Sequence, residues 1–385
     1  MRQSLAALAA VAVVFSGTAY MQGRKTLDIY SIDVEGGQAT LFVSPSGESM
    51  LVDAGSAGER DAGRIVTTAK QAGLTQIDYV VVTHYDGDHV GGVKDVADRF
   101  PVKTFVDHGP RVTPAGAPAP TPQQQANTDR GDAAYAAAVA TGHHIEVAPG
   151  DKVPIKGMDV QVVSSKGRVI TKPLAGGGAK NALCADFAAH PIDTTENINS
   201  VGMVIGLSDR FRMLDLGDLT WNTEHDLACP NNLVGSIDVY LTTHHGLARS
   251  GVPVLVEAIA PRVVLMNNGP RKGGSAEVWD TLRRTKSIQD VWQLHYSAQR
   301  PSSANFEEQR EPGGPSYNAP EPFIANLDVP SLPPAGQQPG PGGPGTQPPH
   351  SPAYNVKVSV RPDGTFTVVN SRNGFSKEYK AGPKR

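Results

Sequence analysis

The chain has 385 residues, of which 39% are apolar, and a formal net charge of −3. This length and apolar content suffice for a large hydrophobic core and predict one to three domains. The slightly acidic balance excludes a global positive field for nucleic acid or an anionic membrane, although a locally basic groove stays open.

Residues 1–22 have the pattern of a secretory signal peptide. Arg2 precedes an apolar run over residues 5–15, and small residues follow through Ala19. This run is too short for a comfortable membrane-spanning helix. We therefore expect export to the periplasm or the extracellular space, with no membrane span after cleavage. An uncleaved N-terminal anchor is the alternative.

The two cysteines, Cys184 and Cys229, lie in polar surroundings typical of loops. In an oxidising compartment such a pair favours a disulfide over two reactive thiols. A thiolate ligand or nucleophile is the alternative, but neither cysteine has a neighbouring histidine or a CxxC spacing.

Strand-like and helix-like segments alternate through the first 300 residues. Strands are predicted over 27–32, 39–43, 49–53, 79–82, 103–107, 160–163, 200–207, 211–216, 239–242, 263–266 and 291–294. Helices are predicted over 58–72, 131–141, 252–260 and 276–284. Long loops without periodicity are expected over 110–130 and 166–180. This order predicts an α/β fold with mixed sheets, in four layers of helix, sheet, sheet and helix.

The C-terminal part is expected to complete a main domain that spans residues 23–328. Residues 329–352 are rich in Pro, Gly and Gln, which predicts a flexible loop. Residues 353–385 alternate around a Pro-Asp-Gly turn and predict a β-hairpin that is too small to be stable alone. We expect it to dock on a sheet edge, anchored by Phe375 and Tyr379.

The segment from Thr83 to Gly92 follows the apolar run 79–82 and is dense in potential metal ligands. Within six positions it contains His84, Asp86, Asp88 and His89. Asp and Gly are poor strand and helix formers, so the segment is expected to be a loop. A loop braced by a buried strand can bring ligands together and hold them. A polar turn that merely contains two histidines is the alternative.

Further strands end in potential ligands at Asp53, Asp218 and His244. Strand ends that gather on one rim are where α/β architectures place ligands. Asp218 is the expected bridging carboxylate, and Asp215 is a competitor that lies deeper in the strand. If the strand continues, the side chain of His245 points away from that of His244. One imidazole would then be a ligand, and the other would support a ligand or face the substrate.

The sequence His84-Tyr85-Asp86-Gly87-Asp88-His89 resembles the HxHxDH signature of the metallo-β-lactamase superfamily, with Asp86 in place of the second histidine. This HxDxDH form resembles the hydrolase domain of ComEC, the bacterial competence DNA-uptake channel. Supporting segments are residues 32–39, 51–55, 199–200, 216–218 and 244–246. The resemblance covers residues 27–300 and implies a metallo-β-lactamase-like αββα sandwich.

The resemblance also implies a centre for one or two divalent metal ions. The implied ligands are His84 and Asp86 for the first metal, Asp88 and His89 for the second, Asp218 as a bridge and His244 to complete the second site. The histidine usual in the family's third motif is missing, so the first site is expected to be weak, to be filled by water, or to be completed by His108, His144 or Asn199. Zn²⁺ is expected, and Mn²⁺ is the alternative because a carboxylate replaces an imidazole.

A bound divalent metal lowers the pKa of its water toward about 7 and so provides hydroxide at neutral pH. We expect Asp88 to orient this nucleophile or accept its proton, so the predicted catalytic residues are Asp88 and Asp218. The residues predicted to face the substrate are His108, Asn199, His245, Lys272 and His295. An exposed basic turn is the alternative for Lys272, and a structural histidine is the alternative for His108 and His295.

These features predict an exported metal-dependent hydrolase, with phosphodiesters favoured by the ComEC-like pattern. The alternatives are a lactam or lactone hydrolase of the same superfamily and a non-catalytic metal-binding module. We expect a small-molecule or nucleotide-type substrate and no stable nucleic-acid complex, because no basic and aromatic residues interleave. The sequence leaves the oligomeric state open.

Overall fold

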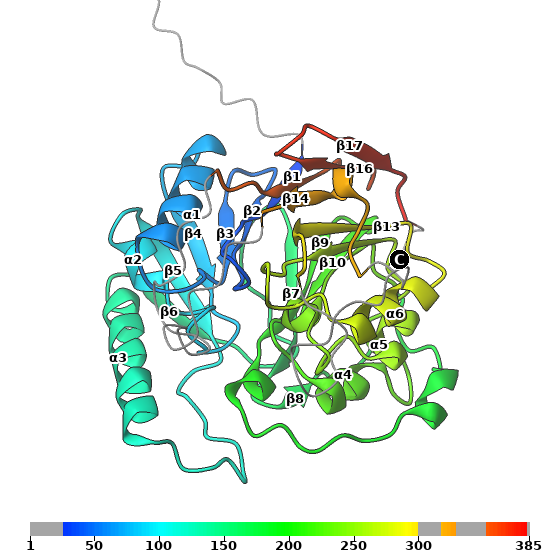
Figure 1. Ribbon diagram of the computed structural model, residues 1–385, viewed down its shortest axis with the longest axis horizontal. Helices are drawn as coiled ribbons and strands as arrows, with labels where there is room; N and C mark the ends of the chain where they lie inside the picture. Colours follow the sequence, from blue (N-terminus) through cyan, green and yellow to red (C-terminus); the bar gives the residue numbers. More distant parts are fainter. Residues whose placement is uncertain (1–25, 299–316, 329–351, 383–385) are drawn as a thin grey trace, which may run out of the picture.

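The fold is built from two β-sheets stacked face to face, with helices on both outer faces (Figure 1). The computed structural model describes residues 26–298, 317–328 and 352–382. The predicted signal peptide and nearly all of the predicted Pro/Gly-rich loop therefore lie outside the described residues. No helix within the described ranges has the length and apolar character needed to cross a membrane.

The first sheet has the strand order β17-β16-β15-β1-β2-β3-β4-β5-β6. Its strands are β1 (Leu27–Ser31), β2 (Thr40–Val43), β3 (Ser49–Val52), β4 (Ile77–Val81), β5 (Val102–Asp107), β6 (His143–Glu146), β15 (Val356–Val360), β16 (Phe366–Asn370) and β17 (Ser376–Tyr379). The strands from β3 to β6 run parallel, and the others pair antiparallel. The sheet is therefore mixed.

The second sheet has the order β14-β13-β12-β11-β10-β9-β7-β8. Its strands are β7 (Asp159–Ser165), β8 (Arg168–Val169), β9 (Gly202–Leu207), β10 (Phe211–Asp215), β11 (Val239–Leu241), β12 (Val263–Met266), β13 (Asp290–His295) and β14 (Ile324–Asn326). The strands from β10 to β14 are parallel, and β9 pairs antiparallel with both β10 and β7. This sheet is mixed as well.

Three apolar clusters correspond to the three interfaces between layers. Side chains such as Phe42, Met213 and Trp292 fill the space between the sheets. The outer face of the first sheet is covered by α1 (Glu59–Gln71), α2 (Val93–Ala97) and α3 (Pro122–Val139). The outer face of the second sheet is covered by α4 (Trp221–Ala228), α5 (Pro253–Ile259) and α6 (Ala276–Arg284). The predicted four-layer αββα sandwich with mixed sheets is confirmed.

Helix α3 begins earlier than predicted, at Pro122 instead of residue 131. The Thr121 side chain accepts a hydrogen bond from the Gln124 backbone N–H, and the Gln124 side chain accepts one from the Thr121 backbone N–H. This capping box, with proline in the first turn, is a helix-start signal that outweighs the polar composition. The hydrophobic pattern missed it because the helix buries only Tyr135 and Ala138.

The C-terminal strands extend the first sheet beyond β1. Strand β15 pairs antiparallel with β1, and β16 and β17 follow it outward. The Tyr379 hydroxyl donates to Asp290 Oδ2 at 2.7 Å and accepts from Trp292 Nε1 at 2.9 Å. The ring of Phe375 lies 5.6 Å from that of Trp292. Phe375 and Tyr379 therefore both contact strand β13 of the opposite sheet.

A disulfide joins Cys184 to Cys229, as the sequence favoured. It ties the 3-10 helix η1 (Ala182–Asp186) to the C-terminal end of α4 across a sequence separation of 45 residues. Replacing both cysteines with serine should lower the free energy of unfolding by up to about 4 kcal/mol, because the unfolded chain regains the entropy of an open loop. Urea unfolding of the oxidised protein and the double variant measures this.

Reduced wild-type protein is the matched control for the double variant, because it loses the cross-link and keeps both side chains. If the oxidised protein, the reduced protein and the double variant had equal urea midpoints and equal slopes of unfolding free energy against urea, the cross-link would not constrain the unfolded state.

Candidate metal centre

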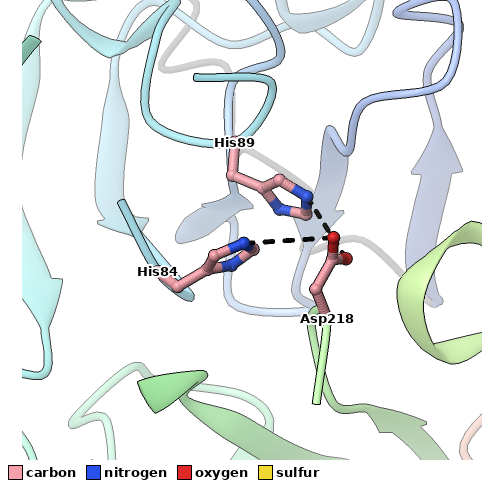
Figure 2. Close-up of side chains that lie close together, drawn as sticks. All are labelled: His84, His89 and Asp218. Atoms are coloured by element: carbon pink, nitrogen blue, oxygen red, sulfur yellow. Dashed lines mark ion pairs between the residues drawn. The ribbon is translucent and has the colours of Figure 1, made fainter. Parts of the chain in front are cut away.

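Ligand-type side chains from both sheets converge at one edge of the sandwich. The loop after β4 carries the residues from His84 to His89, and Asp218 follows β10. The 3-10 helix η3 (Thr243–Gly246), which follows β11, carries two more histidines. Figure 2 shows the imidazoles of His84 and His89 facing the Asp218 carboxylate.

Gly217 lets the two sheets approach closely enough to share this centre. Its φ is +56°, and a Cβ at this position would lie 2.8 Å from the Thr83 Cβ. Only glycine adopts this backbone conformation without strain and leaves room for Thr83. The Gly217 carbonyl also accepts a hydrogen bond from the His244 backbone N–H at 2.9 Å. The turn therefore positions Asp218 and η3 together.

The two carboxylate oxygens of Asp218 face different pairs of imidazoles. Asp218 Oδ2 lies 3.9 Å from His84 Nε2 and 3.3 Å from His244 Nε2. Asp218 Oδ1 lies 3.2 Å from His89 Nε2 and 3.3 Å from His245 Nε2. The carboxylate is therefore placed to bridge two neighbouring sites.

The aspartates of the loop after β4 divide between these two sites. Asp86 Oδ2 lies 3.7 Å from His84 Nε2. Asp88 Oδ2 lies 3.6 Å from His89 Nε2 and 3.5 Å from His245 Nε2. One donor group therefore consists of His84, Asp86 and His244, and the other consists of Asp88, His89 and His245. We call them the first and the second donor group.

Unpaired buried atoms show that these donors fit a divalent metal. His84 Nε2 and Asp218 Oδ1 are buried and have no hydrogen-bond partner among the described residues. The Nε2 atoms of His89 and His245 approach each other to 3.2 Å, and both face Asp218 Oδ1. Imidazole nitrogens and carboxylate oxygens that point at one position are the donor set that binds Zn²⁺ or Mn²⁺.

The charges of the centre are strongly coupled. Burial disfavours the charged form of His89, but Asp218, Asp53 and Asp88 together raise its pKa well above the usual value. Burial alone would raise the pKa of Asp218, yet His244, His245 and His89 hold it well below the usual range. A metal that binds here must therefore displace protons from the second donor group.

His244 differs from His89 because its own pKa is lowered to about 4. Burial is the main cause, and it outweighs the attraction of Asp218. At neutral pH the imidazole of His244 is therefore uncharged, which is the form that binds a metal.

Asp53 supports His89 from behind and does not face the other ligands. Its Oδ2 accepts a hydrogen bond from His89 Nδ1 at 2.7 Å and another from Thr83 Oγ1 at 2.7 Å. Its Oδ1 accepts from the Thr83 backbone N–H at 2.8 Å. A carboxylate that fixes the far nitrogen of a metal-binding imidazole sets its tautomer and ring orientation. Asp53, a potential ligand by its position at a strand end, therefore contacts His89 and Thr83.

Replacing Asp53 with asparagine should weaken metal binding by roughly 10–100-fold, since partners of this kind contribute that much to affinity. The asparagine amide has one acceptor oxygen, so it cannot accept from His89, the Thr83 hydroxyl and the Thr83 backbone N–H together as the two carboxylate oxygens do. Titration against a competing chelator measures the change. Asp78→Asn is the matched control, because Asp78 is a buried carboxylate at the opposite end of β4, where it bonds Ser49. Equal affinities in the two variants would contradict the assignment.

His245 differs from the sequence prediction. The alternation of a continuing strand would turn it away from His244, but β11 ends at Leu241. His244 and His245 instead have φ values of +54° and +57°. Two successive left-handed residues turn both imidazoles toward Asp218. The imidazole of His244 also faces Asp218 Oδ2, the oxygen that faces His84, although the resemblance assigned His244 to the second site.

Two residues predicted near the substrate form a separate hydrogen-bonded group. His108 Nε2 lies 2.9 Å from Glu196 Oε1, and Asn199 Nδ2 donates to Glu196 Oε2 at 2.9 Å. Asn199 Nδ2 also donates to the Val112 carbonyl at 3.0 Å. These contacts connect η2 (Glu196–Asn199) to the segment after β5. They do not bring His108 or Asn199 to the first donor group.

The remaining predicted residues also have identifiable partners. His144 Nε2 pairs with Asp107 at 2.9 Å, and His295 Nε2 pairs with Asp33 at 2.6 Å, so neither joins the two donor groups. Asp215 accepts from Gln38 Nε2 at 2.9 Å and from the Gly217 backbone N–H at 3.1 Å, and burial raises its pKa to about 6. Lys272 alone reaches the centre, where its ammonium contacts Asp88 Oδ2.

The comparison with protein-family models gives a match in the N-terminal part of the sandwich. Residues 32–163 match the family model described as the metallo-beta-lactamase superfamily. No curated protein gives a match.

Several solved structures are similar at low identity. The metallo-beta-lactamase fold protein YhfI from Bacillus subtilis has 14% identity over 70% of this chain and 97% of that chain, with a TM-score of 0.39. Tm1679, a metal-dependent hydrolase of the beta-lactamase superfamily, has 13% identity over 70% of this chain and 97% of that chain, with a TM-score of 0.41. The subclass B3 enzyme MEM-A1 from a soil metagenome library has 15% identity over 58% of this chain and 77% of that chain, with a TM-score of 0.33.

The family match begins just after β1, ends within β7 and includes the whole loop from His84 to His89. Over residues 32–163, about a third of its length, this chain is therefore similar in sequence to the metallo-β-lactamase superfamily.

Proposed function

We propose that this protein is a hydrolase that uses two divalent metal ions and acts on phosphodiesters. The observation that carries the proposal is the arrangement around Asp218, where one carboxylate oxygen faces His84 and His244 and the other faces His89 and His245. Such an arrangement offers one carboxylate to two ions and two imidazoles to each of them.

The first donor group would hold one ion and the second donor group the other. Metal ions held there would lower the pKa of water and stabilise negative charge on an attacked oxygen. The side chain of Asp88 is 25% exposed, whereas the imidazoles of His89 and His245 are buried. Within the second donor group Asp88 is thus the ligand that solvent can reach, and we assign it the task of orienting the attacking water and accepting its proton.

In the proposed reaction the water oxygen forms a bond to phosphorus and one P–O ester bond breaks. The proton that Asp88 accepts returns to the departing alkoxide, so the products are a phosphomonoester and an alcohol. His89 stays oriented by Asp53, and η3 holds His244 and His245 in place throughout.

Two observations favour a phosphodiester over a lactam or lactone. The HxDxDH sequence resembles the ComEC hydrolase domain, with Asp86 where lactam hydrolases of the superfamily would be expected to have a histidine. In addition, the ammonium of Lys272 adjoins Asp88 and offers a positive charge beside the metal ligands.

Metal analysis and paired assays test this proposal. The chain from residue 23 onward would be purified, its metal counted by mass spectrometry, and its activity measured on bis(p-nitrophenyl) phosphate and on a chromogenic β-lactam. We expect about two ions per chain and phosphodiester cleavage that a chelator abolishes and Zn²⁺ or Mn²⁺ restores. Asp88→Asn should lack turnover.

The other outcomes separate the alternatives. Cleavage of the β-lactam alone would favour the lactam hydrolase. Absence of both metal and turnover would favour a binding module and contradict the proposal.

We also propose that the protein is exported. The N-terminal pattern over residues 1–22 supports this, and so does the disulfide between Cys184 and Cys229, since such bonds persist in oxidising compartments. The intact mass of protein from the periplasmic or extracellular fraction should lack the signal segment. A full-length mass confined to the membrane fraction would instead indicate an uncleaved anchor.

A further inference from the structure

Lys272 lies beside the candidate metal centre, on the loop between β12 and α6. Its ammonium contacts Asp88 Oδ2, and 36% of its side chain is exposed. Within the described ranges, no other lysine or arginine forms an ion pair with Asp53, Asp86, Asp88 or Asp218. Lys272 is therefore the cation that borders both the ligands and solvent.

The backbone of this loop fixes the position of Lys272 independently of Asp88. The Gly269 backbone N–H donates to the Lys272 carbonyl at 2.8 Å, and the Gly274 N–H donates to the His245 carbonyl at 3.1 Å. A Cβ on Gly273, whose φ is +78°, would lie 2.0 Å from the His245 carbonyl oxygen. The loop thus packs directly against η3, and the Lys272 side chain extends from a braced backbone.

The charges of the centre explain what such a cation can do. The four carboxylates of Asp53, Asp86, Asp88 and Asp218 together balance two divalent ions when the imidazoles are neutral. The ammonium of Lys272 is then a positive charge in excess. Asp88, moreover, cannot give the same oxygen fully to a metal and to Lys272, so metal binding frees the ammonium for another anion.

We propose that Lys272 binds a nonbridging oxygen of the substrate's phosphoryl group, which makes the enzyme selective for anionic substrates. This inference rests on the proposed hydrolase function and adds the substrate's charge and the residue that recognises it. A lysine ammonium acts here as a point charge with three donors, so it binds phosphate without a demanding geometry. Lys272 touches the substrate and not the attacking water, so it determines binding more than turnover.

The test compares Lys272→Met and Lys272→Arg with the wild-type protein, each as the zinc-loaded chain from residue 23 onward. Titration calorimetry measures the binding of inorganic phosphate, and mass spectrometry measures the metal content. We expect unchanged metal content and phosphate binding weaker by roughly 10–100-fold in Lys272→Met, as befits a lost hydrogen bond to a charged group. Lys272→Arg should recover much of the binding, and KM for the phosphodiester should rise more than kcat falls.

Lys103→Met is the matched control, because it breaks a lysine–aspartate pair with Asp78 at the far end of the first sheet. It should bind phosphate as the wild type does. Unchanged phosphate binding in Lys272→Met would overturn the proposal, and so would a loss of metal in that variant, since Lys272 would then serve only to hold Asp88. Phosphate binding that depends on Lys272 in a protein without diester hydrolysis would refute the proposed function and leave only the anion-binding role of Lys272 standing.

Discussion

Replacing Asp218 with alanine is expected to remove metal from both donor groups and to lower hydrolysis by at least about 100-fold. Outer partners of metal ligands already contribute 10–100-fold to affinity, so a directly bound carboxylate should contribute more. Asp218 should matter doubly because its two oxygens face different histidine pairs. Metal counting and the rate of phosphodiester cleavage measure the two effects on one preparation.

Asp215→Asn provides the control for Asp218. Asp215 is a buried carboxylate three positions earlier, but its partners are Gln38 and the Gly217 backbone N–H. Gln38 Nε2 also lies 3.1 Å from Asp215 Oδ1, the oxygen that accepts from the Gly217 backbone N–H, so a single asparagine oxygen can accept both hydrogen bonds and metal content should be retained. If Asp218→Ala kept one tightly bound ion while Asp215→Asn lost one, the bridging role would belong to Asp215.

The second large effect concerns how the adjacent histidines divide between the two ions. His244→Ala and His245→Ala should each leave about one ion per chain, because each imidazole faces a different oxygen of Asp218. Turnover should fall strongly in both variants, since the remaining ion lacks its partner. Metal counts on freshly purified protein give the primary result.

Combination with His84→Ala identifies which histidine belongs to which ion. His84 and His244 share one donor group, so the double variant should still hold one ion. His84→Ala combined with His245→Ala affects both groups and should hold none. The opposite pattern would place His244 in the second site, as the sequence resemblance implied. The comparison relies on the rule that mutational effects add when they act on independent sites and do not add when they act on one shared site.

The sequence predicted most of the fold because apolar runs and strands coincide. The run over 263–266 became β12 and the amphipathic segment 276–284 became α6 without any shift in their bounds. Helix α3 was shortened in the prediction because its first turns are polar, and its capping box at Thr121 was not recognised. Helix α4 was not predicted at all. It has only 8 residues, so its hydrophobic pattern covers little more than two turns.

The site was predicted as a set of residues, but its internal geometry was not. The loop motif and Asp218 were recognisable by residue type and position after strands. The direction of His245 depends on two left-handed backbone conformations, which no hydrophobic pattern encodes. The support of His89 by Asp53 and the pairing of His295 with Asp33 join residues 36 and 262 positions apart. Such pairings depend on how the strands stack.

The close approach of the two sheets at Gly217 would give metal ions in the proposed centre a second, structural role. His84 and His89 extend from the first sheet, whereas Asp218, His244 and His245 extend from the second. Ions bound at the proposed centre would therefore cross-link the two sheets. The disulfide provides no such link, because Cys184 and Cys229 both lie on the second sheet's side. Folding and metal uptake would thus be thermodynamically linked, and the melting temperature of this protein should rise with the concentration of free metal.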